Sequence, residues 1–140
     1  MITPRQDFCT VFGYDGKLYS IGGTDAKGTV LSSCERYDIT KGKWEQLSPM
    51  LTSRKAFAAA SLPDGIYVFG GTNDKQPFLN EVERYDYYSD RWEKLKPMTH
   101  RRNSHSVVAS IDYQSIYVFG GAAERQLKSI EVYSVLEDRW

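Results

Sequence analysis

Short apolar runs broken by polar turns recur along the whole chain. The first two runs, at residues 8–12 and 17–21, flank a turn that contains Asp15-Gly16. Because glycine accepts the positive φ angle of a tight hairpin turn, this arrangement predicts a β-hairpin. Such a pair of runs returns twice, at residues 57–69 with the turn Asp64-Gly65 and at residues 105–119 with a longer turn, Asp112 to Ser115. We therefore expect three hairpins.

Further strand segments follow each hairpin. The expected third strands cover residues 34–38, 82–86 and 130–134, and the expected fourth strands begin at Trp44 and Trp92. Each fourth strand ends before a proline, which cannot donate a hydrogen bond to a sheet. No stretch longer than ten residues keeps the apolar spacing of a helix without a Gly or Pro interrupting it. The predicted fold class is therefore all-β.

Glycine pairs, tyrosines and tryptophans hold the same phase in every unit. The glycine pairs are Gly22-Gly23, Gly70-Gly71 and Gly120-Gly121. The tyrosines Tyr37, Tyr85 and Tyr133 lie 48 residues apart, and a tryptophan follows each of them seven residues later (Trp44, Trp92, Trp140). A period near 50 indicates a stacked or radial repeat. Function is then expected on the loop faces that the repeats share, and not in a single catalytic pocket.

Composition narrows the class of partner. The chain has 140 residues, 41% of them hydrophobic, with 18 acidic and 18 basic residues and no polybasic block. This argues against nucleic acid or an anionic membrane as the main partner, because such surfaces need clustered Lys and Arg. No signal peptide or membrane span is visible. Cys9 and Cys34 align with small or apolar strand residues, so we interpret them as packing residues without a disulfide. We expect a reducing, cytoplasmic location, with the nucleus as an alternative.

The spaced Gly-Gly, Tyr and Trp of each unit resemble the kelch repeat, and this resemblance covers the chain from Met1 to Trp140. Kelch repeats form the four-stranded antiparallel blades of a β-propeller. The Glu-Arg-Tyr-Asp strings at 35–38 and 83–86, with the Met-x-x-x-Arg junctions, look most similar to the BTB-kelch (kelch-like) branch. The resemblance to this branch implies a segment that recognises substrate proteins for a cullin-3 ubiquitin ligase. A BTB domain, which this chain does not contain, would recruit the cullin.

The resemblance divides the chain into three repeats, at residues 1–49, 50–97 and 98–140. Because propellers usually carry four to eight blades, three repeats do not close a ring, and we expect about half of a six-bladed propeller. The third repeat reaches Trp140, where its fourth strand should begin. An open segment would leave blade faces and a strand edge bare, so alone it should be marginally stable or associate.

Three arginines occupy the same position of the repeat, in the junction between one blade and the next. They are Arg5, Arg54 and Arg102. In several kelch-like propellers the corresponding arginines bind acidic side chains or phosphate, and the guanidinium fork suits such ligands. The alternative is that each arginine pairs with a nearby carboxylate or backbone carbonyl and locks adjacent blades together. Arg101, beside Arg102, favours binding at the third junction.

The loops that follow the glycine pairs differ between repeats, while the strands hardly differ. Variable loops on a repeated scaffold are where binding specificity normally lies. Phe78 is expected either to anchor a partner or to pack on its own blade. The candidate partner-binding residues of these loops are Thr24, Asp25, Thr72, Asn73, Asp74, Phe78, Glu124 and Arg125.

Other repeated residues are interpreted as structural. The tyrosines and tryptophans are expected to pack between blades, because their phase is the same in every unit. Likewise, Glu35, Glu83 and Glu131 are expected to pair with a repeat arginine or a backbone amide. His105 aligns with Phe8 and Phe57, so it should pack at the start of an inner strand.

Catalysis finds little support in the sequence. The two histidines, His100 and His105, lack the Cys or carboxylate spacing of a metal site. Gly22-Gly23 leads into a variable loop and not into a helix, so no phosphate-binding glycine loop is present. Ser104, beside His105, has no third partner for a catalytic triad. We expect no enzyme activity, no metal and no cofactor.

Three functions compete. The leading hypothesis is the BTB-kelch module that binds an acidic or phosphorylated segment of a substrate protein. The alternative is a kelch scaffold or cytoskeletal protein that binds actin and has no role in ubiquitin transfer. Some kelch propellers are oxidases or sugar mutarotases, but copper oxidases need paired Tyr and His ligands, and two clustered histidines are too few.

Overall fold

The apolar runs form eleven β-strands in the computed structural model, which describes residues 1–140. All but one of the expected strands lie within one residue of the predicted ends; at β9 the difference is two residues. The structure contains no helix that could span a bilayer. The strands are β1 (Cys9–Phe12), β2 (Leu18–Ile21), β3 (Cys34–Asp38), β4 (Lys43–Leu47), β5 (Ala58–Leu62), β6 (Gly65–Phe69), β7 (Val82–Asp86), β8 (Arg91–Leu95), β9 (Ser106–Ala109), β10 (Ser115–Phe119) and β11 (Ile130–Ser134).

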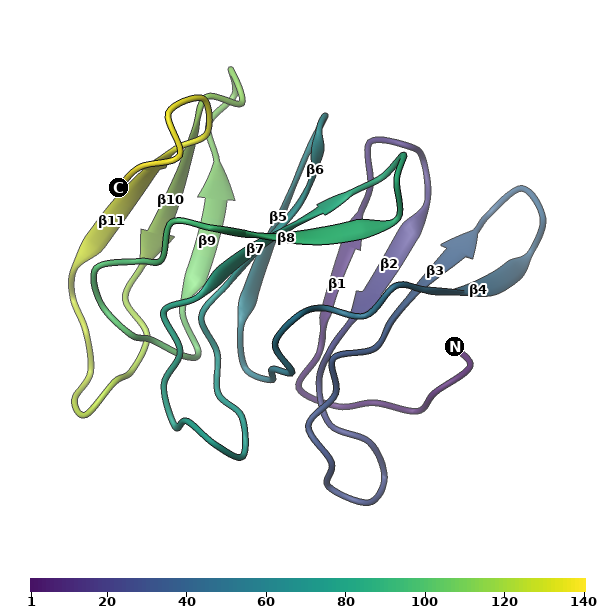
Figure 1. Cartoon of the computed structure of the whole chain (residues 1–140), viewed down its shortest axis with the longest axis horizontal. Coiled ribbons are helices and arrows are strands. Elements are labelled where there is room, and N and C mark those ends of the chain that lie inside the picture. The colour runs from purple at the N-terminus through teal and green to yellow at the C-terminus, as the bar shows by residue number, and fades with distance from the viewer.

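Three antiparallel sheets stand next to one another as blades (Figure 1). Blade 1 contains β1 to β4 and blade 2 contains β5 to β8, each in chain order, while blade 3 contains β9 to β11. The first strands of the blades, β1, β5 and β9, lie side by side. This arrangement confirms the all-β fold class and the antiparallel blades expected from the sequence.

Backbone crowding explains the repeated glycine pair. Gly22 has a φ of 59° and Gly23 a φ of 89°, which residues with a side chain rarely adopt. A Cβ atom at Gly22 would lie 2.6 Å from the carbonyl oxygen of Arg54, and the amide of Gly23 donates to that same oxygen at 2.9 Å. The glycines therefore let the end of β2 touch the junction that leads into blade 2.

Apolar side chains of neighbouring blades form the core. Between blades 1 and 2, Tyr19 and Ile21 belong to one buried cluster with Ile66, Val68 and Tyr85 of blade 2. Tyr67 and Phe69, on the other face of blade 2, form a second cluster with Ile116, Val118 and Tyr133 of blade 3. Fully burying a side chain of this size stabilises a fold by roughly 1.5–3 kcal/mol. Blade-to-blade packing is thus the main source of stability.

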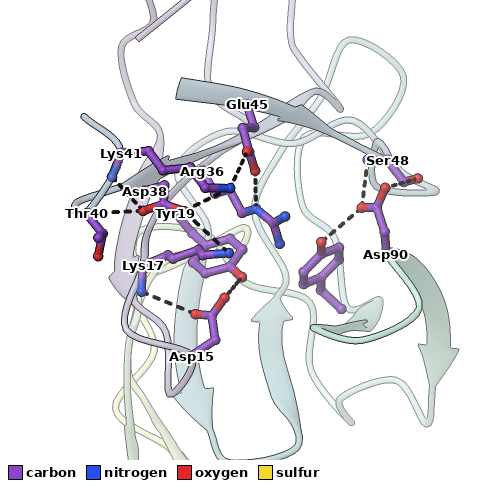
Figure 2. A network of polar contacts seen from close by, with 11 residues as sticks. Asp15, Lys17, Tyr19, Arg36, Asp38, Thr40, Lys41, Glu45, Ser48 and Asp90 are labelled. Atoms are coloured by element: carbon purple, nitrogen blue, oxygen red, sulfur yellow. Dashed lines mark hydrogen bonds and ion pairs between the residues drawn. The ribbon is translucent and has the colours of Figure 1, made fainter. Parts of the chain in front are cut away.

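The repeated tryptophan and its neighbours connect one blade to the next. Trp92 Nε1 donates to the carbonyl of Ser48 at 2.9 Å. Asp90 accepts hydrogen bonds from the Ser48 amide at 3.0 Å and from the Tyr85 hydroxyl at 2.9 Å. Figure 2 shows the Ser48–Asp90 contact beside a polar network of blade 1 in which the Tyr19 hydroxyl donates to Asp15 at 2.8 Å. These contacts confirm that the repeated aromatic residues pack between blades.

Both cysteines are strand residues. Cys9 lies in β1 and Cys34 in β3, and they form no disulfide. Burial raises the pKa of the Cys9 thiol to about 11 and that of the Cys34 thiol to about 12. Both side chains therefore remain thiols at neutral pH, and the interpretation as packing residues is confirmed.

Candidate partner-binding face

Each junction pairs with the variable loop of its own repeat. Isolated antiparallel bridges join Gln6 to Thr24, Lys55 to Thr72 and Asn103 to Ala122. The three variable loops consequently extend from the same end of the sheets, at the bottom of the view in Figure 1. This end of the molecule, with its junctions and loops, is the candidate partner-binding face.

Arg54 shows how the repeated arginine is held. Its amide donates to the carbonyl of Leu31 at 3.1 Å, and its own carbonyl accepts from Gly23 at 2.9 Å, so its backbone is bonded to repeat 1. Its guanidinium group donates to the carbonyl of Gly70 at 2.7 Å and to the carboxylate of Glu83 at 2.7 Å, both in repeat 2. One residue therefore ties two blades together.

The guanidinium contacts recur in the other two repeats, and the backbone of Arg102 is likewise bonded to the preceding repeat, through the Leu79 carbonyl at 3.0 Å and the Gly71 amide at 2.9 Å. Arg102 donates to the carbonyl of Gly120 at 2.8 Å and to Glu131 at 2.5 Å. Arg5 donates to Glu35 at 2.7 Å. Each glutamate also accepts hydrogen bonds from two backbone amides of the junction that contains its arginine. This agrees with the structural role expected for these glutamates. We call each arginine with its glutamate and glycine carbonyl the arginine lock.

The lock glutamates of the first and third repeats, Glu35 and Glu131, are charged. Burial alone would raise the pKa of Glu35, but hydrogen bonds from Arg5 and from the amides of Ile2 and Thr3 outweigh it and hold the pKa below its ordinary value. At Glu131, burial is similarly outweighed, here by the Thr99 amide and Arg102. The first and third locks are therefore buried ion pairs at neutral pH.

The lock arginines are not available to a partner. The side chains of Arg5, Arg54 and Arg102 have an exposed fraction of 0%. A guanidinium group without exposed surface cannot bind an acidic side chain or phosphate of another protein. The structure therefore supports the lock between blades, and it corrects the expectation that these three arginines contact a partner.

Several of the predicted loop residues shape their own loops. Thr24 is buried, which corrects its assignment to a contact surface. Asp25 accepts the amides of Thr29 and Lys27, which lower the pKa of its carboxyl group. In the second loop, Thr72 donates to the Gln76 carbonyl at 3.2 Å. The side-chain oxygen of Asn73 accepts a hydrogen bond from the Gln76 amide at 2.9 Å. These side chains set the loop conformation, while Asp74 remains exposed.

Four of the predicted residues do come together. Phe78, Arg101, Glu124 and Arg125 line one open hollow of about 520 Å³, together with His100, Ala123 and Leu127. We call it the third-repeat hollow. Phe78 is half-buried in its wall, and its role as an anchor for a partner stays a prediction. The side chain of His100 lies 3.2 Å from Glu131.

The third-repeat hollow is basic. Arg101 and Arg125 are exposed, and neither forms an ion pair. A neighbouring depression extends the hollow along Gln126 to Ser129 and adds Lys128, which also has no carboxylate partner. Sequence analysis missed Lys128, because only the fold shows that it continues the wall formed by Arg125. The spacing of Arg125 and Lys128 along the variable loop was the available signal.

The other two repeats have hollows of a different character. The first, of about 200 Å³, is lined by Pro4, Gln6, Asp25 and Ala26 and has no exposed cation. The second, of about 330 Å³, contains Asp74, Lys75 and Glu81. Of these three hollows, only the third-repeat hollow therefore has an excess of exposed, unpaired cations. No group of three or more His, Cys, Asp or Glu side chains is placed to hold a metal ion.

Comparison with known proteins agrees with this geometry. No curated protein matches the chain. A family model, the KLHDC2/KLHL20/DRC7 Kelch-repeats domain, matches residues 1–140. Kelch-repeat domains bind protein partners in general and are usually interaction modules. The chain therefore belongs to the family of KLHDC2/KLHL20/DRC7 Kelch-repeats domains.

Proposed function

We propose that the chain recognises substrate proteins for a cullin-3 ubiquitin ligase as part of a BTB-kelch adaptor, acting in the cytoplasm. The strings at 35–38 and 83–86 and the Met-x-x-x-Arg junctions support this branch of the kelch family. The bound segment is acidic or phosphorylated and lies in the third-repeat hollow.

One observation carries the choice of this hollow. Arg101, Arg125 and Lys128 face it without a carboxylate partner, and Glu124 is its one exposed acidic side chain. A hydrogen bond to a charged group contributes roughly 1.5–3 kcal/mol, and an arginine fork provides two. Phe78 and Leu127 add apolar surface for a neighbouring side chain of the partner.

The test is a pull-down from cytosol, read by quantitative mass spectrometry. The tested variant combines Arg101→Ser with Arg125→Gln. Serine is chosen at position 101 because the second junction has a serine, Ser53, at the same position of the repeat. We expect the amount of captured partner to fall by about tenfold or more, because the variant loses one or two charged hydrogen bonds to the partner. The control Lys27→Ser, in the variable loop of the first repeat, should change nothing. Equal capture by both variants would place binding elsewhere.

A second arm tests the ligase role. The same capture with the full-length protein should recover cullin-3 along with the substrate. Recovery of actin filaments without cullin-3 would favour the scaffold function in place of ubiquitin transfer.

A further inference from the structure

The arginine lock of the second repeat differs from the other two at one residue. In the first repeat Arg5 Nη2 donates to the hydroxyl of Ser33 at 3.2 Å, and in the third Arg102 Nη2 donates to the hydroxyl of Ser129 at 3.2 Å. The second repeat has Glu81 at this position. Arg54 keeps its bond to the backbone carbonyl of Glu81, at 3.1 Å, but makes no hydrogen bond to the Glu81 side chain, whose charge acts on Arg54 less strongly than that of Glu83.

The carboxylate of Glu81 is left without a partner. It makes no ion pair or hydrogen bond, and its Oε2 atom is shielded from solvent. Arg54 is already neutralised by Glu83, at 2.7 Å, so the second lock has one carboxylate more than it needs. A shielded carboxylate oxygen without a donor is destabilising, because it has lost hydrogen bonds to water and gained no hydrogen bond in return. A serine would satisfy the lock, as it does in the other repeats.

Glu81 lines the hollow of the second repeat. Asp74 and Lys75 are the other charged residues of this hollow, so it has a net negative charge. The third-repeat hollow has a net positive charge from Arg101 and Arg125 against Glu124. The loop at residues 72–78 borders both hollows, because Asn73 to Gln76 line the second and Phe78 lines the third. Two adjacent hollows of opposite charge therefore share one wall.

We propose that Glu81, whose side chain is only partly buried, binds a lysine or arginine side chain of the partner through Oε1, the carboxylate oxygen that is not shielded. The bound segment then carries a basic residue for the second hollow and an acidic or phosphorylated residue for the third, with an apolar residue near Phe78 between them. This inference rests on the proposed function of the third-repeat hollow. A local feature that weakens a repeated structural device is expected where binding requires it.

The probe is a display library of random dodecapeptides, panned on the chain and read by sequencing. Wild type should select peptides with a Lys or Arg and an Asp or Glu at a constant separation. Glu81→Ser, which copies Ser33 and Ser129, should lose the preference for the basic residue and keep the acidic one. Its melting temperature should equal or exceed that of wild type. The matched variant Arg101→Ser should instead weaken the preference for the acidic residue.

Affinity provides the second readout. The selected peptide should bind Glu81→Ser about tenfold more weakly than wild type in fluorescence polarisation, as expected for one lost charged hydrogen bond. Replacing its basic residue by glutamine should have the same effect on wild type and none on Glu81→Ser.

Three outcomes overturn the inference. If wild type selects acidic peptides with no basic residue, the proposed site survives and the role of Glu81 does not. Selection of no consensus at all removes the proposed site together with the inference. Finally, if Lys75→Gln lowers the melting temperature, Lys75 itself neutralises Glu81 and no partner cation is needed.

Discussion

His105 occupies the position that Phe8 and Phe57 hold in the other repeats, just before the first strand of its blade. Its side chain is buried, with an exposed fraction of 8%, as its alignment with phenylalanine predicted. Burial, followed by the positive charge of Arg102, lowers the pKa of His105 from 6.5 to about 4. Arg54 adds a smaller effect in the same direction. The folded chain therefore keeps this imidazole neutral at pH 7, because it is buried and because Arg102 and Arg54 lie near it.

This burial predicts that acid weakens the fold. Between pH 6.5 and pH 4 the unfolded chain binds a proton at His105 that the folded chain does not, so stability falls as the pH falls through this window. From pH 7 to pH 5 the loss should be about 2 kcal/mol, at 1.36 kcal/mol for each pH unit below the unfolded pKa. Urea unfolding at the two pH values measures it. His105→Phe, which copies the other repeats, should abolish most of the loss, and an undiminished loss in that variant would contradict the assignment.

At the scale of the element, the strands were predictable and the arginine locks were only partly so. The Asp15-Gly16 turn and the Tyr-to-Trp spacing located strands such as β3 and β7 to the residue, because hairpin turns and sheet register are local properties. The sequence offered two roles for Arg54 and could not choose between them. Its burial depends on the carbonyls of Gly70 and Glu81, which lie 16 and 27 residues further along the chain and approach it only when the repeat has folded.

The candidate site was predictable to a similar degree. Variable loop composition pointed to Phe78, Glu124 and Arg125, which the fold brings together. It also pointed to Thr24, which the fold buries. Composition reports which side chains differ between loops, but exposure is set by how each loop folds back on its own junction.

Removing the lock should separate the two roles of the junction arginines. Arg54→Ala leaves Glu83 as a buried charge without its partner, and such a loss typically destabilises by about 3–5 kcal/mol. Arg101→Ala removes only an exposed side chain and should change stability by less than about 0.5 kcal/mol. Chemical denaturation of the two variants, compared at one pH, is the measurement. A fully stable Arg54→Ala would show that the lock is dispensable.

Backbone hydrogen bonds near the start of the first strands connect all three blades. Asp7, Ala56 and Ser104 precede the first strands of the three blades, and all have a positive φ, of 53°, 52° and 50°. The amide of Ala56 donates to the carbonyl of Asp7 at 3.1 Å, and the amide of Ser104 to the carbonyl of Ala56 at 2.8 Å. The strain of these conformations is offset by a continuous chain of hydrogen bonds through the blades.

The outer face of blade 3 exposes apolar side chains, most of whose counterparts in blade 2 are buried. Tyr117, Phe119, Ile130 and Val132 of β10 and β11 are 36%, 38%, 57% and 42% exposed. Their counterparts Tyr67, Phe69 and Val82 on blade 2 are 2%, 0% and 1% exposed, because blade 3 covers them. An exposed apolar face that matches an internal blade interface is expected to associate.

We therefore expect the 140-residue chain to self-associate reversibly. Light scattering coupled to size-exclusion chromatography should show a mass that rises with concentration. Val132→Arg introduces the arginine that Arg36 and Arg84 provide at the same position of the other blades. Combined with Phe119→Lys, it should place two charges on the exposed face and hold the chain monomeric, because burying an unpaired charge is costly. A matched pair of exposed substitutions on the opposite end, Lys41→Ala and Lys43→Ala, should leave association unchanged. A wild-type mass that stays monomeric at every concentration would mean that this face does not drive association.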